Sequence, residues 1–289
     1  MDKQYIGVVG AGIMGADVAL DLSIHNYKVL LKDLTGKLLD KAHARIEQQF
    51  KLVKMMKKNA LSCSLDDVLS RIIFITNYDR FNETSIVIEN VTESFDVKER
   101  VYTELKDVCE DDVVFGVDTS CISITKIASW MPKPQNVIGM HFLNPVPLKE
   151  LVEVIKGYYT SEETVETTRQ FLKSLDKICV VVNDHPGFVT NRVLMLTINE
   201  CIWLVHDGVA SPADIDTIFK VGFSHKMGPL ATADLIGLDT ILNSLLVLYE
   251  SYKDPKFSPC PLLYQMVDAG LLGQKSGRGF FKYRPGMNA

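Results

Sequence analysis

Short apolar runs alternate with longer amphipathic stretches as far as about residue 183. Each run has about five residues and is rich in Val and Ile, a pattern typical of buried β-strands. We predict strands at residues 5–9, 28–32, 72–76, 86–90, 113–117, 137–141, 151–155 and 178–182. Many of the intervening segments are long enough for helices, and strands joined by helical crossovers form a mostly parallel sheet. The first part of the chain is therefore predicted to be α/β.

Helical patterns dominate the rest of the chain. We place the boundary in the turn-forming segment 183–187, which contains Pro186 and Gly187. This predicts an α/β domain over residues 1–185 and an all-helical domain over residues 186–289. In the second domain we expect helices from about 189 to 207, after Ser211 and Pro212, over 229–252 and over 259–270.

Composition narrows the class of protein. Of the 289 residues 47% are hydrophobic and 23% are charged, which is ample material for packed cores and argues against disorder. The net charge of −5 argues against a dedicated nucleic-acid binder, which normally carries a basic excess. No apolar run approaches the ~18 residues of a membrane span, and no secretory signal is evident. Six cysteines without a CxxC pair or Cys/His cluster predict a cytoplasmic protein without a metal site.

A glycine motif follows the first predicted strand and opens a helix. It comprises Gly10, Gly12 and Gly15, with Ile13 and Met14 between them. In such a turn the glycines allow tight chain reversal and close approach to a pyrophosphate, which the helix N-terminus attracts. Asp33 ends the second strand 21 residues after Gly12, where a carboxylate can accept from ribose hydroxyls and repel a 2′-phosphate. The sequence thus predicts a Rossmann-like domain that prefers NAD to NADP, although the cation of Lys32 works against that preference.

A second candidate site combines His141 with Glu153. His141 ends a predicted strand, and the loop through Asn144 and Pro145 allows the next strand to return with Glu153 beside it. A carboxylate that holds an imidazole fixes its tautomer, as general-base chemistry on an alcohol requires. From this spacing alone, a hydrogen-bonded core histidine with an unrelated glutamate is favoured over a catalytic pair.

Motifs along most of the chain carry a resemblance to a known family. They are GAGIMG (10–15), ENVTES (89–94), TSCISIT (119–125), GMHFLNPVP (139–147), DHPGFVTNR (184–192), MGPL (227–230), DLIGLD (234–239) and GQKSGRGFF (273–281). In this order they resemble the 3-hydroxyacyl-CoA dehydrogenases, most closely the short-chain 3-hydroxybutyryl-CoA type, from about residue 5 to residue 283. The resemblance favours a catalytic role for His141.

The resemblance implies a role for each matching residue. His141 would be the catalytic base and Glu153 its orienting carboxylate. Ser120 and Asn191 would bind the reacting oxygens of the substrate, and donors aimed at the thioester carbonyl favour an enolate-like form. Asn144 would support the histidine, Glu93 and Lys98 would contact the nicotinamide ribose, and Ser120 would also lie at the cofactor. The family's helical domain dimerises, so the resemblance also implies a homodimer.

Residues 41–70 occupy the place of the family's helical clamp over the CoA nucleotide. Lys51, Lys54, Lys57 and Lys58 suit a phosphorylated carrier, although a solvated helix face would look the same. We interpret Met55 and Met56 as packing residues.

Two departures from the family pattern concern the substrate. Asp118 stands where relatives usually have Asn, and Lys149-Glu150 where they usually have Met-Lys. A dehydrogenase of a small hydroxylated acyl group, such as glyceryl on an acyl carrier protein in polyketide extender-unit synthesis, therefore stays open as an alternative. A further alternative is a family relative that has lost catalytic activity. The set of predicted catalytic residues argues against it, because it is intact: Ser120, His141, Glu153 and Asn191.

Overall fold

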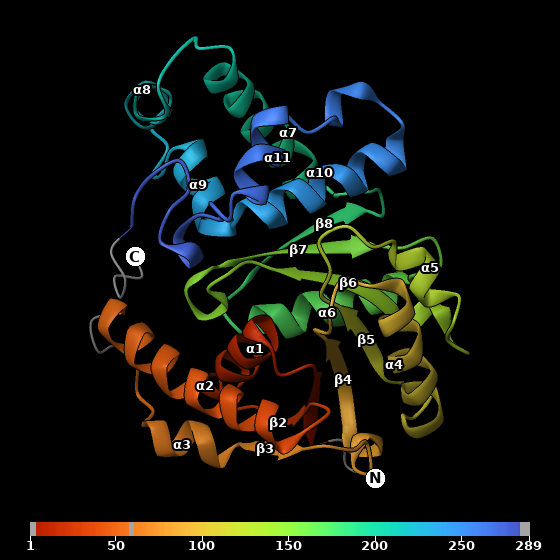
Figure 1. The fold of residues 1–289 in the computed structure, drawn as a ribbon. Coiled ribbons are helices and arrows are strands. Elements are labelled where there is room, and N and C mark those ends of the chain that lie inside the picture. Colours follow the sequence, from red (N-terminus) through yellow and green to blue (C-terminus); the bar gives the residue numbers. More distant parts are fainter. Residues whose placement is uncertain (1–3, 58–60, 284–289) are drawn as a thin grey trace. The chain divides into compact units, whose positions relative to one another are not determined.

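The computed structural model of the protein describes residues 4–57 and 61–283. The chain divides into two compact units, Met1–His185 and Pro186–Ala289, each of which is described by itself. The first unit is α/β and the second is helical (Figure 1). This is the predicted fold class.

The first unit is built on one eight-stranded sheet of order β3-β2-β1-β4-β5-β6-β7-β8. All eight predicted strands form, with ends that differ by at most two residues. They are β1 Tyr5–Val9, β2 Lys28–Lys32, β3 Ile72–Ile75, β4 Thr84–Glu89, β5 Val114–Val117, β6 Val137–Phe142, β7 Leu151–Lys156 and β8 Ile178–Asn183. Every neighbouring pair is parallel except β6 and β7, which are antiparallel. The sheet is mostly parallel, as predicted, and its one reversal lies at the second candidate site.

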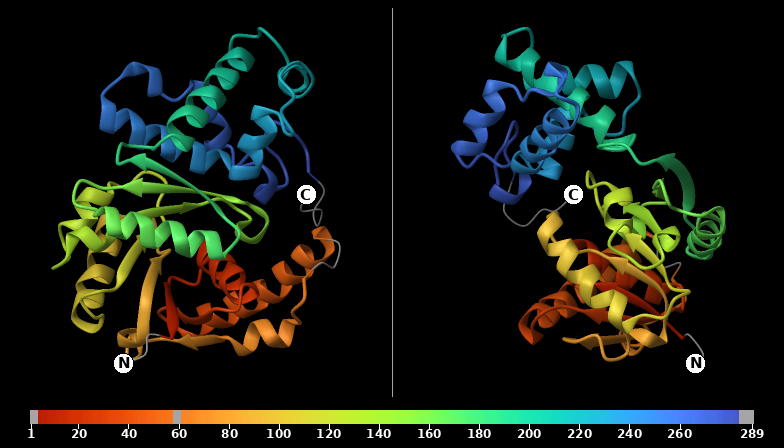
Figure 2. Two further views of the ribbon diagram at one scale, coloured as in Figure 1. Left: turned by 180° about the vertical axis from the view of Figure 1, so that it is seen from behind. Right: turned by 90° about the vertical axis from the view of Figure 1, so that its right-hand side faces the viewer.

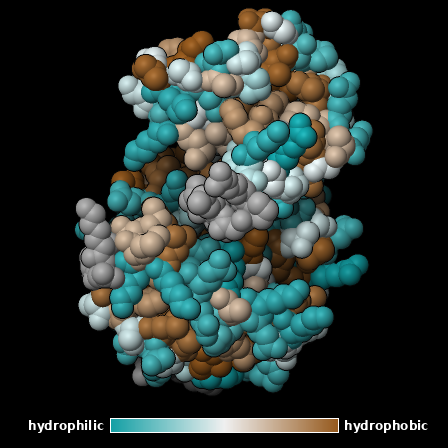
Figure 3. Space-filling view, turned by 60° about the vertical axis from the view of Figure 1, so that its left-hand side comes forward, coloured by the Kyte–Doolittle hydropathy of each residue, from teal (hydrophilic) through white to brown (hydrophobic). Residues whose placement is uncertain are grey.

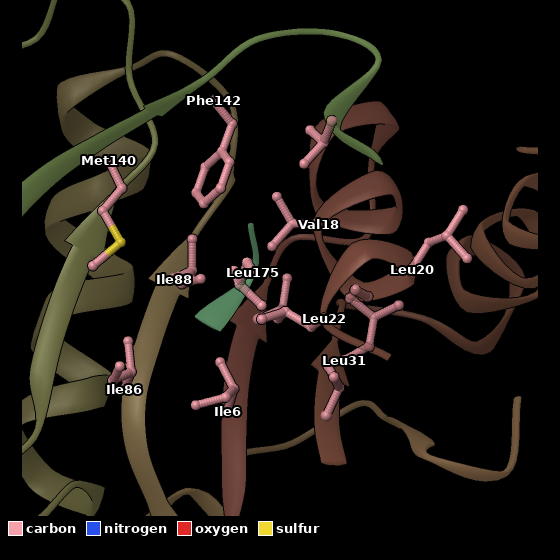
Figure 4. Close-up of a cluster of buried hydrophobic side chains, with 14 of the residues drawn as sticks. Ile6, Val18, Leu20, Leu22, Leu31, Ile86, Ile88, Met140, Phe142 and Leu175 are labelled. Carbon is pink, nitrogen blue, oxygen red and sulfur yellow. The ribbon is translucent and has the colours of Figure 1, made fainter. Parts of the chain in front are cut away.

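Helices cover both faces of this sheet (Figures 1 and 2). They are α1 Ile13–Ile24, α2 Gly36–Met56, α3 Leu65–Ser70, α4 Phe95–Val108, α5 Ile124–Ala128 and α6 Glu162–Ser174, with single turns η1 Phe81–Glu83, η2 Pro134–Asn136 and η3 Val146–Leu148. Side chains of α1, α2, α3 and α6 share one buried cluster with alternate strand residues such as Ile6 and Val8. Figure 4 shows how Val18 and Leu22 of α1 point toward Ile6 and Ile88. Alternation along a strand sends the intervening residues to the other face, where Tyr102 of α4 contacts Phe115 of β5.

The second unit packs its helices around a separate apolar core. Its elements are α7 Thr190–His206, α8 Pro212–Thr217, the π-helical turn η4 Ile218–Gly222, α9 Pro229–Ile236, α10 Leu238–Tyr252, η5 Pro255–Phe257, α11 Pro261–Asp268 and η6 Gln274–Ser276. The segment 229–252 is helical as predicted, and it is divided into the two helices α9 and α10. Gly237 adopts φ +105°, which ends α9 and turns the chain by 97° into α10.

No single helix within residues 4–57 and 61–283 is long and apolar enough to cross a membrane; α9 and α10 pass that test only as a bent pair, by length and composition. On the face shown in Figure 3, hydrophobic side chains form separate patches among hydrophilic ones. Across the described part of the chain, no group of three or more His, Cys, Asp or Glu side chains could hold a metal ion.

Candidate active site

The glycine motif forms a tight turn between β1 and α1. Gly10 has φ +94°, and a Cβ added at Gly15 would lie 1.8 Å from the Gly10 carbonyl oxygen, so neither position accepts a side chain. A Cβ at Gly12, in contrast, would meet nothing within 4 Å. The main chain at Gly12 is thus open to a ligand, as close approach of a pyrophosphate requires. Gly12 also caps α1 without a side-chain hydrogen bond, which leaves the first N–H groups of the helix to an anion.

Asp33 lies at the edge of this turn. One of its carboxylate oxygens accepts from the Ala11 N–H at 2.7 Å, and the other accepts from the N–H of Leu34 at 2.6 Å. The neighbouring cation points elsewhere, because Lys32 is buried with its ammonium 4.2 Å from the centre of the Tyr78 ring. Lys32 therefore does not offset the negative charge that Asp33 presents at the turn.

Glu93 organises the loop that carries Ser120. Its Oε1 accepts from the hydroxyl of Thr119 at 2.5 Å and from the N–H groups of Ser120 and Cys121 at 3.0 and 3.1 Å. The Glu93 side chain is 42% exposed, so part of it is accessible from solvent.

Lys98 lies behind Glu93 and is fully buried. Its ammonium donates to both carboxylate oxygens of Glu89, at 2.8 and 2.9 Å, and lies 3.8 Å from Glu93. Burial raises the pKa of Glu89, and the charge of Lys98 opposes that shift. The sequence analysis expected Lys98 at the ribose and missed Glu89 as its partner. A charged residue at the end of an apolar strand, nine positions before a lysine, was the available signal.

The second candidate site assembles at the antiparallel strand pair. His141 and Glu153 are direct partners in the β6–β7 register, and Nδ1 of the imidazole lies 3.1 Å from Glu153 Oε2. On the other side of the ring, Nε2 lies 3.3 Å from the Ser120 hydroxyl oxygen. Both His141 and Glu153 are buried. When Nδ1 carries the proton and donates to Glu153, Nε2 is left as the acceptor, which is the arrangement of a general base.

Asp118 lies next to this pair and is half-buried. Its Oδ1 accepts from the Phe142 N–H at 3.1 Å, and its own carbonyl oxygen accepts from Lys98 at 3.4 Å. Burial raises the pKa of Asp118 to about 7, while the charge of His141 and the hydrogen bond from Phe142 act in the opposite direction. A titratable carboxyl therefore lies beside the imidazole at the position where relatives were expected to have an uncharged amide.

The remaining predicted site residues lie on other segments. Ile13 is exposed in the first turn of α1, whereas Met14 packs against the core. Asn144 is exposed on the loop after β6, and its bond to Pro145 is cis. Asn191 belongs to the second unit, where it is buried in the first turn of α7.

The expected clamp consists of two helices, α2 and α3. Lys51, Lys54 and Lys57 are exposed near the end of α2, while Lys58 lies outside the described residues. The interpretation of Met55 and Met56 as packing residues is wrong, since both are exposed, by 70% and 58% respectively. They lie between Lys54 and Lys57 on the exposed side of the last turn of α2, whose buried residue is Val53.

Comparison with known proteins identifies the family. Residues 5–185 match the model of the 3-hydroxyacyl-CoA dehydrogenase NAD binding domain, and residues 187–283 match the C-terminal domain of the same family. A probable 3-hydroxybutyryl-CoA dehydrogenase of Deinococcus radiodurans is 43% identical over 277 residues, covering 96% of this chain and 99% of its own length. The 3-hydroxybutyryl-CoA dehydrogenase of Clostridioides difficile is 40% identical over 279 residues, with the same coverage of both chains.

Solved structures agree with this assignment. The (S)-3-hydroxybutyryl-CoA dehydrogenase PaaH1 from Ralstonia eutropha has a TM-score of 0.91 at 38% identity and covers 98% of this chain and 100% of its own. FadB2 from Mycobacterium tuberculosis has a TM-score of 0.93 at 36% identity, with the same coverage. Since family models match both units and the relatives match along nearly the whole length, the resemblance found in the sequence is confirmed. The chain belongs to the 3-hydroxyacyl-CoA dehydrogenase family and is an NAD-dependent oxidoreductase.

Proposed function

We propose that the protein interconverts a short 3-hydroxyacyl-CoA, such as 3-hydroxybutyryl-CoA, and its 3-oxo form. The observation that carries this proposal is the buried imidazole of His141, held by Glu153 on one nitrogen and adjacent to the Ser120 hydroxyl on the other. An alcohol becomes a ketone when its hydroxyl proton and a hydride from the same carbon both depart. The chain supplies a base for the proton, and NAD, when bound, would supply the acceptor for the hydride.

His141 is the acid–base group of this reaction. In the oxidative direction Nε2 takes the proton of the 3-hydroxyl group, and the imidazolium that forms is stabilised by the carboxylate of Glu153. In the reductive direction the same nitrogen returns the proton to the 3-oxo oxygen. Ser120 holds the reacting oxygen within reach of His141, and Asn191 keeps the role that the resemblance implies, which is to polarise the thioester carbonyl. A positioned base contributes about 10²–10⁴-fold to turnover.

The cofactor is held by groups of the first unit. The open main chain at Gly12 and the start of α1 receive the pyrophosphate, and Asp33 accepts from the adenosine ribose hydroxyls. Glu93 accepts from the nicotinamide ribose, and Lys98 acts on that ribose through Glu93, because its own ammonium is buried. Asn144 lies on the loop that follows His141 and supports the nicotinamide end.

CoA is the proposed carrier of the acyl group. The exposed cations of Lys51, Lys54 and Lys57 suit the 3′-phosphate and diphosphate of CoA. Three of the relatives reported above are named for a CoA thioester, so the alternative of an acyl carrier protein has no support from them.

We further propose a cytoplasmic homodimer formed through the helical unit. The segment around η4 exposes Ile218, Val221 and Phe223 by 55%, 77% and 64%, and an exposed apolar patch marks an interaction surface. All six cysteines are free, which suits a reducing compartment. Light scattering should give twice the chain mass, and Phe223→Asp together with Val221→Asp should give the monomer. A wild-type monomer at micromolar concentration would contradict the proposed dimer.

The experiment that tests the catalytic proposal measures cofactor absorbance with a panel of thioesters. Acetoacetyl-CoA with NADH should be reduced with kcat/KM above ~10⁴ M⁻¹s⁻¹, the lower range of ordinary enzymes. If only acyl groups on a carrier protein were turned over, an acyl carrier protein would replace CoA as the proposed carrier. If the protein binds NADH but turns over none of these thioesters, the remaining interpretation is that it is a family relative that lacks catalytic activity.

A further inference from the structure

The segment between β6 and β7 determines how His141 and Glu153 meet. Residues 143–150 reverse the chain through the turn η3, and the two strands then pair so that His141 lies opposite Glu153. A shift of one residue in this register would send the Glu153 side chain to the other face of the sheet. The ends of the turn must therefore be fixed for the imidazole to keep its carboxylate.

The ammonium group of Lys177 binds both ends of this turn. It donates to the carbonyl oxygens of Val146 at 2.7 Å and Lys149 at 2.8 Å. An ammonium has three N–H donors, and the third partner is Asp21 of α1, whose Oδ2 lies 2.9 Å away as an ion pair. The side chains of Lys177 and Asp21 are only 4% and 2% exposed. The cluster is therefore an internal tie between α1 and the turn, and not a surface ion pair.

Lys177 is itself fixed by the sheet. It directly precedes β8, and the N–H of the next residue, Ile178, donates to the carbonyl oxygen of Glu150 at 2.6 Å. The parallel register that follows pairs Glu153 with Val180. Through Lys177, the edge strand β8 therefore holds the returning end of the loop that leads to Glu153.

Removal of this ammonium would leave the Lys149 carbonyl oxygen and the buried Asp21 carboxylate without this donor, and would leave the Val146 carbonyl oxygen with the N–H of Lys149, 3.3 Å away. An unsatisfied buried polar group is unfavourable, so the turn would move to reach water or other donors. The Asp21 carboxylate depends on the lysine especially, since burial raises its pKa and the charge of Lys177 is the largest influence that opposes this shift.

We propose that Lys177 is a positioning residue, which acts on catalysis by holding the His141–Glu153 pair in register through the carbonyl oxygens of Val146 and Lys149. It touches neither of these two side chains. Asp21 holds the ammonium in place and connects the turn to α1, the helix at whose start the cofactor binds. The kinetic part of this inference rests on the proposed function.

The test compares Lys177→Met with Lys173→Met, a matched change at an exposed lysine of the preceding helix. We expect Lys177→Met to lower kcat at least tenfold, with the Kd for NADH within threefold of wild type, because the lysine does not reach the glycine turn. Lys173→Met should leave both values unchanged. If Lys177→Met does not fold, the double variant Asp21→Asn with Lys177→Met replaces it, because it leaves no unpaired buried charge.

A second measurement separates positioning from general loss of stability and needs no turnover. The imidazole ¹H–¹⁵N signals of His141, assigned by their loss in His141→Gln, report its hydrogen bond to Glu153. We expect these signals to shift in the folded Lys177 variant and to stay in place in Lys173→Met. A folded variant with kcat within twofold of wild type, or with unchanged His141 signals, would overturn the inference. Should the wild type itself lack dehydrogenase activity, the proposed function would fail, and the His141 signals would still decide the role of Lys177.

Discussion

The Asp118 carboxyl accepts a hydrogen bond from the main-chain N–H of Phe142, the residue that directly follows His141. A partly buried carboxyl is thereby attached to the strand that carries the His141 imidazole. Its pKa of about 7 means that it changes charge in the pH range where the enzyme is expected to work. Two predictions concern this residue.

Asp118 should make stability depend on pH. Its pKa is raised from 3.8 when unfolded to about 7 when folded, so the folded state binds the proton more tightly. The stability that this bound proton adds to the folded state is fully present below pH 4 and is lost as the pH rises through 7. Asp118→Asn should therefore gain stability relative to wild type between pH 5 and pH 8, by a few kcal/mol. The free energies of unfolding of the wild type and of Asp118→Asn, measured in urea at pH 5 and at pH 8, test this prediction. A difference between the two proteins that does not change with pH would contradict it.

The same carboxyl should influence the preference between NAD and NADH. An ionised Asp118 stabilises the positively charged oxidised nicotinamide, whereas the protonated form does not. At pH 8 we expect Asp118→Asn to shift the ratio of affinities toward NADH, and at pH 5.5 we expect a much smaller shift. Titration calorimetry with both cofactors provides the measurement. Equal ratios for the two proteins at pH 8 would show that the carboxyl is too far from the ring to act.

Asp33 should determine the choice between NAD and NADP. It stands at the glycine turn, and the nearby cation of Lys32 is directed onto Tyr78. NAD should bind at least ~10-fold more tightly than NADP, a difference of about 1.4 kcal/mol, and Asp33→Ala should reduce that ratio. Fluorescence titration of both reduced cofactors tests the prediction. Equal affinities in the wild type would refute the role of Asp33.

His141 and Glu153 should act as one unit. His141→Gln should lower kcat by about 100-fold or more with little change in NADH affinity, since the base is lost and the glycine turn is untouched. Glu153→Gln should act in the same direction because the imidazolium loses its carboxylate. The double variant should lose much less than the product of the two single effects. Fully multiplicative losses would mean that the two residues act independently.

Lys54 should contribute to recognition of CoA. Lys54→Ala should raise KM for acetoacetyl-CoA a few-fold without changing kcat, and the effect should diminish with salt because the site is exposed. Lys173→Ala, on an exposed position of α6, serves as the charge-matched control. An equal KM increase in both variants would indicate a general effect of charge and not a CoA contact.

The sequence alone determined the elements that depend on local pattern. Eight apolar runs predicted eight strands, because alternation and burial leave a direct trace in residue order. The glycine turn was equally readable, since the space between Gly10 and Gly15 admits no side chain and Asp33 follows at the end of the next strand. The order of the family motifs identified the reaction class before any distance was known.

Tertiary structure decided which residues meet. His141 and Glu153 are 12 residues apart, and only the antiparallel register of β6 and β7 turns that spacing into a contact of 3.1 Å. The exposure of Met55 and Met56 and the tie from Lys177 to the turn after β6 left no such trace. The burial of Lys98 against Glu89 left only the weak signal of a charged residue at the end of an apolar strand. Residue order records how each segment is buried on average, whereas these contacts join segments brought together only by pairing and packing of the whole sheet.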